Sequence, residues 1–277
     1  MNYLKYRFEL HKSGVSGDVL IAYLSEFNFE SFVQNSDFVE AYIPENESLN
    51  EGHLNRLLKD FDEELDYQKE LIKDQNWNAQ WESDYPVVIV DDRLIVRAPF
   101  HEKFSGEYEF DIQIQPKMSF GTGHHETTFL MLQNLLKADV EGKEVLDMGS
   151  GTGVLAIAAF LLGAGSVLAI DIEQWAYENT LENIDLNSAQ VDVNKGDVNT
   201  IKGLSFDLIL ANINKNVLLS DMKSYVEALK NGGSLYLSGF FGTDVDDLQV
   251  KAEQLGLTII SVNQKLNWAA MHLTKLY

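Results

Sequence analysis

The sequence EVLDMGSGTGVL at residues 144–155, followed by VLAIDI at residues 167–172, decides the fold of this chain. It has the pattern of a buried strand, a glycine-rich turn, an apolar helix and a second strand that ends in an acid. This order is typical of a βαβ unit, in which the first turn lets a nucleotide-like ligand approach the backbone. The two segments therefore predict an α/β fold with a ligand site at the first turn.

The spacing of the glycines indicates which ligand the turn accepts. A dinucleotide fingerprint needs GxGxxG, but the glycines here are Gly149, Gly151 and Gly153, and Val154 stands where the third fingerprint glycine would have to be. The spacing DxGxGxG, which starts at Asp147, points away from NAD and toward S-adenosylmethionine. We expect Gly149 and Gly151 to bind this cofactor. The alternative is a structural turn that needs glycine only for its φ angles.

A regular alternation of strands and helices continues from residue 144 to the end of the chain. Apolar helices are expected between the first six strands, so the pattern predicts a doubly wound parallel sheet. The last two strands meet at Asn267-Trp268 with too little chain for a helical crossover, and must pair antiparallel. We therefore predict a Rossmann-like seven-stranded sheet with one reversed strand. The expected strands are Val145–Asp147, Val167–Ile172, Val191–Asn194, Phe206–Ala211, Gly233–Gly239, Leu257–Leu266 and Ala269–Tyr277.

Residues 1–73 alternate short elements of different types. The order βαββαβ predicts a small α+β domain of the ferredoxin-like type. It contains no cluster of catalytic residues, so we expect it to serve recognition. The expected strands are Tyr3–Leu10, Phe32–Gln34, Val39–Ile43 and Leu65–Ile72, and the expected helices are Asp18–Phe27 and Leu49–Phe61.

A polar segment with two tryptophans separates the two zones. Trp77 and Trp81 are one helical turn apart, which predicts a short linker helix over residues 74–85 with both rings on one face. The alternative is that the rings stack on a ligand. The predicted organisation is thus a substrate-recognition domain over residues 1–73, this linker helix, and a cofactor-binding domain over residues 86–277.

Three polar side chains follow the strands at the edge where open parallel sheets bind ligands. Asp171 ends the second strand, and an acid there can accept both ribose hydroxyls. Asn212 follows the fourth strand and is the predicted catalytic residue, because its amide oxygen can hold an amine hydrogen and aim the nitrogen lone pair at the methyl group. Asp197 follows the third strand and could bind the adenine amino group. The alternatives are a solvated helix cap for Asp171 and turn residues for the other two.

The loop SFGTGHHETT at residues 119–128 precedes an apolar helix. Its glycines, histidines and hydroxyl residues make it a candidate for a lid or a loop that faces the cofactor. His124 or His125 could take a proton during the reaction. The histidines lack acidic neighbours at metal-ligand spacing, so no metal site is expected. Thr127 or Thr128 could be merely a helix cap.

Together these motifs resemble the methyltransferase of large-subunit ribosomal protein eleven, the PrmA family. The resemblance covers the second half closely and the domain order throughout. It implies an S-adenosylmethionine-dependent methyltransferase sheet and transfer of methyl groups to lysine side-chain and N-terminal amines of a basic ribosomal protein, which the N-terminal domain grips. The matching segments are Phe120–Thr128, Asp147–Gly153, Ile170–Ile172 and Ala211–Ile213. The cofactor ligands implied by the resemblance are Thr128, Gly149, Asp171 and Asn212.

An amine must be neutral to accept a methyl group. A free lysine, with a pKa of about 10.4, is only about 0.04% neutral at pH 7. Burial lowers the pKa of an amine, whereas nearby acids raise it. We therefore expect the reacting nitrogen to enter a dry slot beside Asn212, with the acids of the chain acting only at long range.

Composition limits the partners of this chain of 277 residues. It has 43 acidic and 21 basic residues, a formal net charge of −22, which would repel a phosphate backbone, so no direct nucleic-acid binding is expected. The charge serves solubility or attracts a basic substrate. No apolar run approaches the length of a membrane span, residues 1–14 lack the apolar stretch of a signal peptide, and cysteine is absent. We expect a cytoplasmic monomer.

Two other interpretations of the sequence stay open. A methyltransferase of the same fold could act on RNA or a small molecule, or the chain could be a binding module without activity. The net charge disfavours RNA, and a front domain without an evident pocket disfavours a small molecule. The intact turn at Asp147–Gly153 together with Asp171 argues against loss of cofactor binding.

Overall fold

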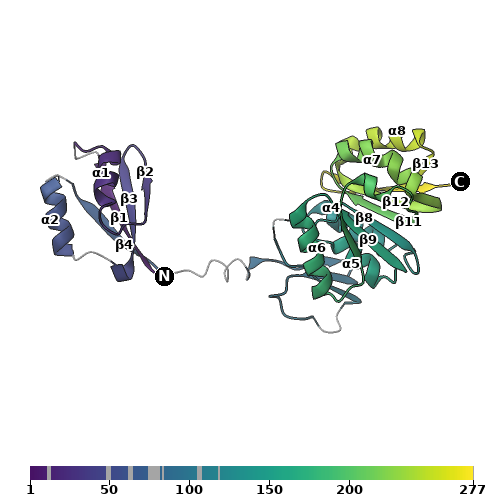
Figure 1. Ribbon diagram of the computed structural model, residues 1–277, viewed down its shortest axis with the longest axis horizontal. Coiled ribbons are helices and arrows are strands. Elements are labelled where there is room, and N and C mark those ends of the chain that lie inside the picture. The colour runs from purple at the N-terminus through teal and green to yellow at the C-terminus, as the bar shows by residue number, and fades with distance from the viewer. Residues whose placement is uncertain are drawn as a thin grey trace. The chain divides into compact units, whose positions relative to one another are not determined.

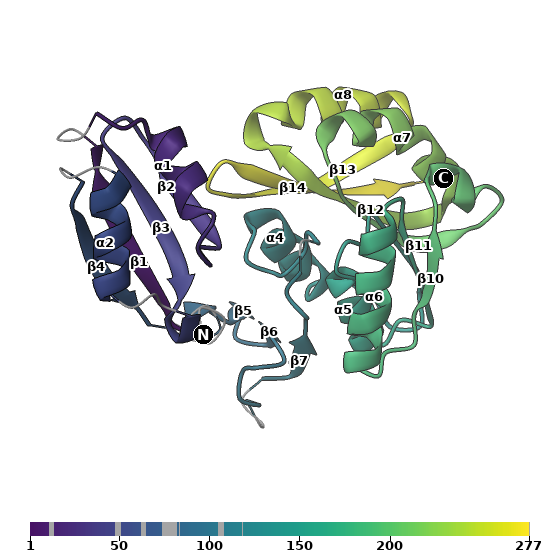
Figure 2. The same ribbon diagram turned by 60° about the vertical axis from the view of Figure 1, so that its left-hand side comes forward.

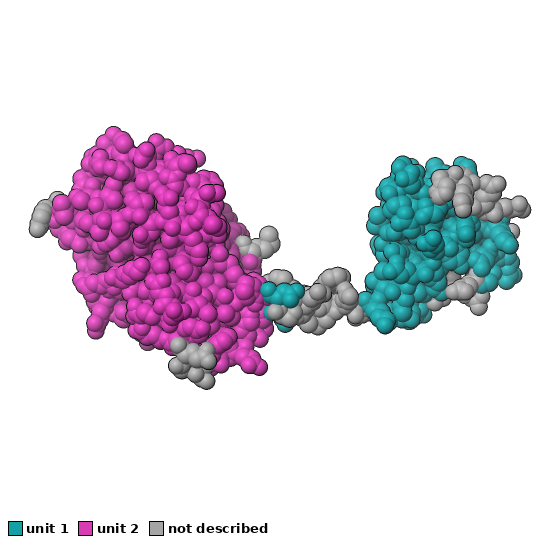
Figure 3. Space-filling model, turned by 180° about the vertical axis from the view of Figure 1, so that it is seen from behind, with its two compact units in different colours: residues 1–84 teal, residues 85–277 magenta. Residues whose placement is uncertain are grey.

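The chain folds into two compact units, residues 1–84 and 85–277, each with its own hydrophobic core (Figures 1 and 3). The computed structural model describes residues 1–10, 14–47, 51–61, 65–73, 82, 84–104, 108–117 and 119–276. The linker helix predicted over 74–85 falls largely on residues 74–81 and 83, so that prediction, with Trp77 and Trp81, lies outside the described residues. None of the helices in the described parts has the length and apolarity needed to cross a membrane.

Unit 1 is a four-stranded antiparallel sheet with its helices on one face. The sheet order is β2-β3-β1-β4. Alternate residues of β1, namely Leu4, Tyr6 and Phe8, are buried, and they pack with Leu20 of α1 and Leu54 of α2. The predicted small α+β domain is therefore confirmed. Its elements are β1 (Tyr3–Glu9), α1 (Gly17–Leu24), β2 (Ser31–Gln34), β3 (Phe38–Pro44), α2 (Glu51–Phe61) and β4 (Tyr67–Ile72).

Unit 2 is built on a seven-stranded sheet in the order β10-β9-β8-β11-β12-β14-β13. β14 runs antiparallel to both of its neighbours, and the other strands are parallel to one another. The predicted seven-stranded sheet with one reversed strand is confirmed. The strands are β8 (Glu144–Met148), β9 (Ser166–Asp171), β10 (Asp192–Lys195), β11 (Phe206–Asn212), β12 (Leu229–Phe241), β13 (Leu257–Lys265) and β14 (Trp268–Lys275).

Helices cover both faces of this sheet (Figure 2). On one face of the sheet, side chains of α4 and α5 form a hydrophobic core with side chains of the strands. Ile184 of α6 is partly buried against this core. The core on the opposite face contains side chains of α7 and α8. The helices are α4 (Glu126–Leu135), α5 (Val154–Leu161), α6 (Gln174–Leu186), α7 (Lys215–Ala228) and α8 (Val245–Gln254).

The prediction of a helix between the third and fourth strands was wrong. The connection from β10 to β11 carries only a single 3-10 turn, η3 (Val198–Ile201). The chain between Lys195 and Phe206 is short, and it contains Gly196 and Gly203, of which Gly203 has a φ of +79°. An α-helix across the sheet needs a longer segment without such interruptions.

A second, smaller sheet in unit 2 leads into the loop that precedes α4. It consists of β5 (Val88–Val90), β6 (Leu94–Arg97) and β7 (Phe110–Gln113), in that order, and its buried side chains join the core around α4 and α5. Two asparagines, Asn183 in the last turn of α6 and Asn187 directly after this helix, hold the end of this sheet. Asn187 bonds the backbone of Gln113, and Asn183 accepts the N–H of Gln115 at 2.8 Å.

Candidate active site

The glycine turn between β8 and α5 is required by the packing of the protein itself. Gly149, Gly151 and Gly153 have φ angles of +77°, +57° and +79°. A Cβ on Gly149 would lie 2.3 Å from Cγ2 of Ile213, and one on Gly151 would lie 2.3 Å from the carbonyl oxygen of Phe120. The positive φ angles agree with the structural interpretation of the turn, and the close contacts are a second reason for glycine that the sequence did not predict.

Hydrogen bonds fix this turn to the loop before α4. Thr152 donates its hydroxyl to the Gly121 carbonyl at 2.7 Å and its N–H to the Phe120 carbonyl at 3.0 Å. Asn183, which also holds Gln115, donates its side-chain amide to the Thr152 carbonyl at 2.8 Å. Both Thr152 and Asn183 are fully buried. The turn and the loop therefore form one rigid wall.

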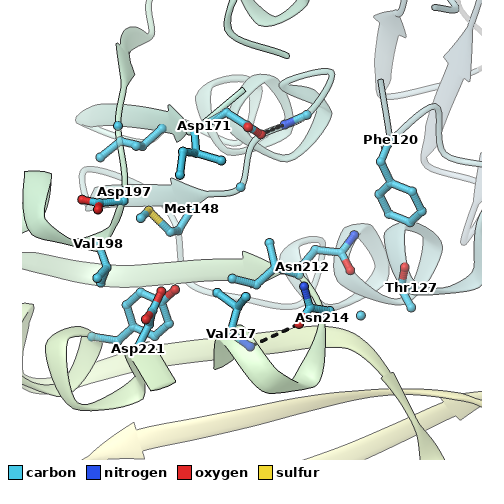
Figure 4. A pocket seen from close by; sticks show the side chains of 18 of the residues that line it. Phe120, Thr127, Met148, Asp171, Asp197, Val198, Asn212, Asn214, Val217 and Asp221 are labelled. Atoms are coloured by element: carbon cyan, nitrogen blue, oxygen red, sulfur yellow. Dashed lines mark hydrogen bonds between the residues drawn. The ribbon is translucent and has the colours of Figure 1, made fainter. Parts of the chain in front are cut away.

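A cavity of about 490 Å³ opens beside this wall, at the edge of the sheet where the parallel strands end. Gly149 and Gly151 of the turn line it, together with Asp171 at the end of β9, Asp197 after β10 and Asn212 at the end of β11 (Figure 4). These five positions, all singled out from the sequence, are thus brought together in one place, and His125 and Thr127 of the loop before α4 line the same cavity.

Figure 4 shows that the cavity has two ends of different character. Asn212 and Asn214 lie between these ends. One end has Asp197, Val198 and Asp221, and the other has Phe120 and Thr127. Sequence reasoning missed Val198, Asp221 and Tyr225 in the lining, because nothing in the pattern of η3 and α7 marks which helix face meets a ligand.

Asp171 is bonded to the glycine turn and keeps capacity for a ligand. Its Oδ2 accepts the N–H of Gly151 at 2.9 Å, and its Oδ1 accepts the N–H of Glu173, just before α6, at 3.0 Å. Figure 4 shows the first of these bonds. A carboxylate has about four lone-pair sites, so two remain. Asp171 thus lies at the cavity, as predicted. It is not the N-cap of α6, because that residue is Glu173, whose N–H donates to Asp171 just before the helix begins.

Asp197 has the bonds of a turn aspartate, although it lines the cavity. Its two oxygens accept the backbone and side-chain N–H groups of Asn199 at 2.9 and 3.0 Å, and it caps η3. These hydrogen bonds, the backbone bond foremost, lower the pKa of this exposed carboxyl. The turn interpretation of Asp197 therefore describes its contacts, while its position still borders the cavity.

Asn212 presents an unused hydrogen-bond acceptor beside the cavity. The residue is 8% exposed, and its Nδ2 donates to the Thr128 hydroxyl oxygen at 3.4 Å. Its Oδ1 is buried and has no hydrogen-bond partner among the described residues. A buried acceptor without a donor is costly to a protein, so this atom marks a place where a ligand donor fits.

Thr128 lies behind Asn212 and does not line the cavity, whereas its neighbour Thr127 does. Both threonines are fully buried on the first turn of α4. Neither of them caps this helix, because the cap is His125, whose Nδ1 accepts the Thr127 N–H at 3.3 Å. Thr128 is therefore linked to the cavity only by its hydrogen bond to the side-chain amide of Asn212.

The two histidines of the loop lie in different places. His124 does not line the cavity, and its ring nitrogens contact the Pro86 carbonyl at 2.8 Å and the Thr122 hydroxyl at 3.2 Å. His125 does line it, with Nδ1 occupied by Thr127. Because each ring already has a hydrogen-bonded nitrogen, both contribute to holding the loop.

Aromatic rings form the end of the cavity near Phe120. The His125 ring centre lies 4.9 Å from that of Phe120 and 4.6 Å from that of Trp268, and Trp268 contacts Phe241 at 4.2 Å. Trp268 begins β14 and pairs with Phe241 of β12, so the reversed strand delivers it to the site. No local sequence pattern could have assigned Trp268 to the cavity.

Asp147, the first residue of the DxGxGxG motif, lies buried behind the turn. Its Oδ2 accepts the Ala156 N–H at 3.1 Å, and its Oδ1 has no hydrogen-bond partner among the described residues. Burial, assisted by the nearby Asp171 carboxylate, raises the pKa of Asp147 to about 7, against the lowering effect of the Ala156 bond. Asp147 ties β8 to α5 and does not line the cavity.

Comparisons with known proteins agree on one family. A family model described as ribosomal protein L11 methyltransferase (PrmA) matches residues 16–276. The ribosomal protein L11 methyltransferase of Porphyromonas gingivalis is 44% identical over 286 residues, covering 99% of this chain and 98% of that protein. That of Bacteroides fragilis is 40% identical over 278 residues, covering 98% and 99%. The crystal structure of ribosomal protein L11 methylase from Lactobacillus delbrueckii subsp. bulgaricus has 27% identity and a TM-score of 0.64, and covers 70% of this chain and 100% of that one.

Proposed function

This chain belongs to the ribosomal protein L11 methyltransferase (PrmA) family, and we propose that it transfers methyl groups from S-adenosylmethionine to lysine side-chain and N-terminal amines of ribosomal protein L11. The observation that carries the proposal is the buried Oδ1 of Asn212, an acceptor without a donor at the edge of the cavity. An amine N–H is the donor that this reaction would bring there.

The residues of the cavity fit S-adenosylmethionine. The volume of the cavity, about 490 Å³, lies in the range of small-molecule sites. Asp171 has lone pairs left for two ribose hydroxyls, and the turn at Gly149 and Gly151 precedes α5, whose N-terminal dipole favours a carboxylate. When bound, the sulfonium supplies an electrophilic methyl group and leaves as a neutral thioether.

Asn212 orients the amine in the proposed reaction. Its Oδ1 accepts an N–H of the amine, so that the nitrogen lone pair points along the line of displacement. The Thr128 hydroxyl accepts a hydrogen bond from Nδ2 of the same amide at 3.4 Å, and in this proposal that bond fixes the orientation of Oδ1. In this proposal Thr128 is a positioning residue, and Asn212 touches the substrate.

The aromatic end of the cavity favours the neutral amine. Phe120, His125 and Trp268 exclude water around the nitrogen, and desolvation lowers the pKa of an amine. Neither histidine serves as the base in this proposal. Nδ1 of His125 accepts the Thr127 N–H, so in the neutral ring the proton is on Nε2 and no basic nitrogen is free. The amine therefore loses its proton to water before it enters.

Residues 1–73 are proposed to hold the substrate and residues 86–277 to carry out the reaction, joined by residues 74–85. Among the described residues, those that line the cavity belong to residues 85–277, and unit 1 is proposed to serve recognition. A net charge of −22 favours a basic protein over nucleic acid. With a ribosomal protein as substrate, we propose that the enzyme acts in the cytoplasm, as a monomer.

Methyl transfer from labelled S-adenosylmethionine tests the proposal. The protein is incubated with purified ribosomal protein L11, with ribosomal RNA and with a low-molecular-mass cell extract in parallel. Label is expected in the protein substrate alone, on amines identified by peptide mass spectrometry. Label in RNA or in a metabolite would show that ribosomal protein L11 is not the substrate. Cofactor binding without any methyl transfer would show that the chain is a binding module.

A further inference from the structure

A second hollow, which we call the hairpin hollow, adjoins the aromatic end of the cavity. It has a volume of about 510 Å³ and lies between the 3-10 turn after β12, η4 (Gly242–Asp244), and the hairpin that joins β13 to β14. Phe241 lines this hollow and contacts Trp268, which lines the cavity, with ring centres 4.2 Å apart. The proposed function, on which this inference rests, does not use the hairpin hollow. The residues that line it are Phe241, Gly242, Thr243, Gln264, Leu266 and Asn267.

Backbone hydrogen bonds hold the two sides of the hairpin hollow together. The Gly242 N–H donates to the Asn267 carbonyl at 2.7 Å. The Phe241 N–H donates to Oδ2 of Asp244 at 3.0 Å, and Phe241 pairs with Trp268 in the register of β12 and β14. The hairpin hollow is therefore a preformed part of unit 2.

No charged side chain lines the hairpin hollow among the described residues, although the chain has a net charge of −22. Two charged residues that adjoin the lining in sequence are engaged elsewhere. Nζ of Lys265 lies 3.3 Å from the ring centre of Phe129 on α4. Asp244 accepts a hydrogen bond from Nζ of Lys215 at 2.8 Å. The hairpin hollow is thus an uncharged surface within an acidic protein.

Apolar side chains are exposed where the cavity and the hairpin hollow adjoin. Phe120 of the cavity and Phe241 of the hairpin hollow are each 46% exposed, and Leu266 at the tip of the hairpin is 80% exposed. Leu266 has a φ of +52°, which leucine rarely adopts and which glycine or asparagine would adopt more easily. An exposed leucine in this conformation is a candidate for contact with a ligand.

We propose that the hairpin hollow receives the residue beside a methylated lysine of the substrate protein and selects a neutral side chain there. The stacked rings of Phe241 and Trp268 separate the hairpin hollow from the aromatic end of the cavity, where the amine enters. An extended chain advances about 3.3 Å per residue, so a neighbouring residue reaches across this pair. The acids of the chain attract a basic protein at long range. A charged side chain in the hairpin hollow would lose water without gaining an ion pair, whereas a neutral one enters without this cost.

A charge swap at Thr243, an exposed residue of the lining, tests this assignment. Ribosomal protein L11 is prepared with the residues directly before and after one methylated lysine replaced by glutamate, and in a second form by lysine. The unmodified enzyme should methylate that site in both forms about tenfold less efficiently than in unaltered L11, as judged by kcat/KM. Thr243→Lys should favour the glutamate form and Thr243→Glu the lysine form. The ratio of the two kcat/KM values should differ by at least about 100-fold between these variants.

Thr258→Lys and Thr258→Glu are the matched controls. Thr258 is exposed near the start of β13, away from the hairpin, and it does not line the hairpin hollow. These variants change the net charge equally, so the ratio should differ by no more than about twofold between them. A ratio that responds no more to Thr243 than to Thr258 would overturn the proposal. If the unmodified enzyme methylates no form of L11, the proposed function itself fails, which is a different result.

Leu266→Asn tests the contact at the tip of the hairpin. Asparagine adopts a positive φ more readily than leucine, so the variant should fold. The KM for L11 should rise about fivefold because apolar contact is lost, while kcat and the dissociation constant for S-adenosylhomocysteine stay within about twofold. Leu204→Asn is the control, since Leu204 is 44% exposed and lies outside the hairpin hollow. An unchanged KM in Leu266→Asn would remove Leu266 from the substrate contact.

Discussion

The two walls of the cavity differ in how their polar groups are satisfied. In the locked wall, which we define as residues 149–153 with Asp171, backbone and side-chain bonds hold the turn against the Phe120 loop. The open wall is defined as Asn212 with Asp221. In the locked wall the protein's own hydrogen bonds hold the turn, and only Asp171 keeps lone pairs for a ligand. In the open wall, by contrast, the buried Oδ1 of Asn212 is left without a partner in the described part of the chain.

This difference separates two kinds of mutation. A change in the locked wall should lower stability and binding together, because the same contacts serve both. A change in the open wall should lower binding or turnover and leave stability intact.

The largest effect is expected for Gly151→Ala in the locked wall. Its Cβ would lie 2.3 Å from the Phe120 carbonyl oxygen at a φ of +57°, so strain and a clash add up. We expect a loss of about 4 kcal/mol or more in the unfolding free energy and no measurable cofactor binding. Gly142→Ala is the control, since Gly142 has a φ of +70° and open space around it, and should cost only about 1 kcal/mol. Equal losses in the two variants would refute the role of the clash.

Asp147→Asn should change how stability depends on pH. The pKa of Asp147 is about 7 in the folded protein and about 3.9 in an unfolded chain. Because the folded state binds the proton more tightly, the unfolding free energy falls as the pH rises from about 4 to about 7, by roughly 2–4 kcal/mol. Asparagine has no proton to lose, so the variant should be more stable than the unmodified protein at pH 8 and similar at pH 4. Denaturation curves at both pH values check this, and parallel pH profiles would contradict it.

Asp171→Ala combines the two kinds of effect in the locked wall. Loss of the ribose acceptor should weaken S-adenosylhomocysteine binding about 100-fold, or about 2.7 kcal/mol. Loss of the bonds to Gly151 and Glu173 should lower the unfolding free energy by about 1–2 kcal/mol. Calorimetric titration and denaturation measure both. Unchanged affinity would remove Asp171 from the ribose site.

Thr128→Val gives the smallest expected effect and distinguishes two roles for Thr128. If Thr128 only positions Asn212, the substitution should lower kcat about tenfold. The dissociation constant for S-adenosylhomocysteine should then stay within about twofold of that of the unmodified protein. A cofactor ligand, the role implied by the family resemblance, would instead weaken cofactor binding. Steady-state kinetics with the ribosomal protein, alongside titration, separates these outcomes.

The locked wall could be predicted from local sequence, and the open wall only in part. DxGxGxG after an apolar strand specifies a turn, and Asp171 and Asn212 follow from the rule that strand ends meet at one edge of a sheet. Asp221 and Tyr225 could not be found in this way, because the face that α7 turns to the cavity depends on tertiary packing. Trp268 arrives through the pairing of β14 with β12, which has no local signal. Whether Thr127 or Thr128 lines the cavity depends on the helix phase set by the His125 cap.

Mass spectrometry of ribosomal protein L11 after incubation with S-adenosylmethionine tests the central claim most directly. The unmodified enzyme should add methyl groups to its amines. Asn212→Ala should add them at least about 100-fold more slowly, because the oriented acceptor is lost. The same variant should keep its affinity for S-adenosylhomocysteine within a few-fold, and its stability should not fall. Methylation by Asn212→Ala at the unmodified rate would contradict the account.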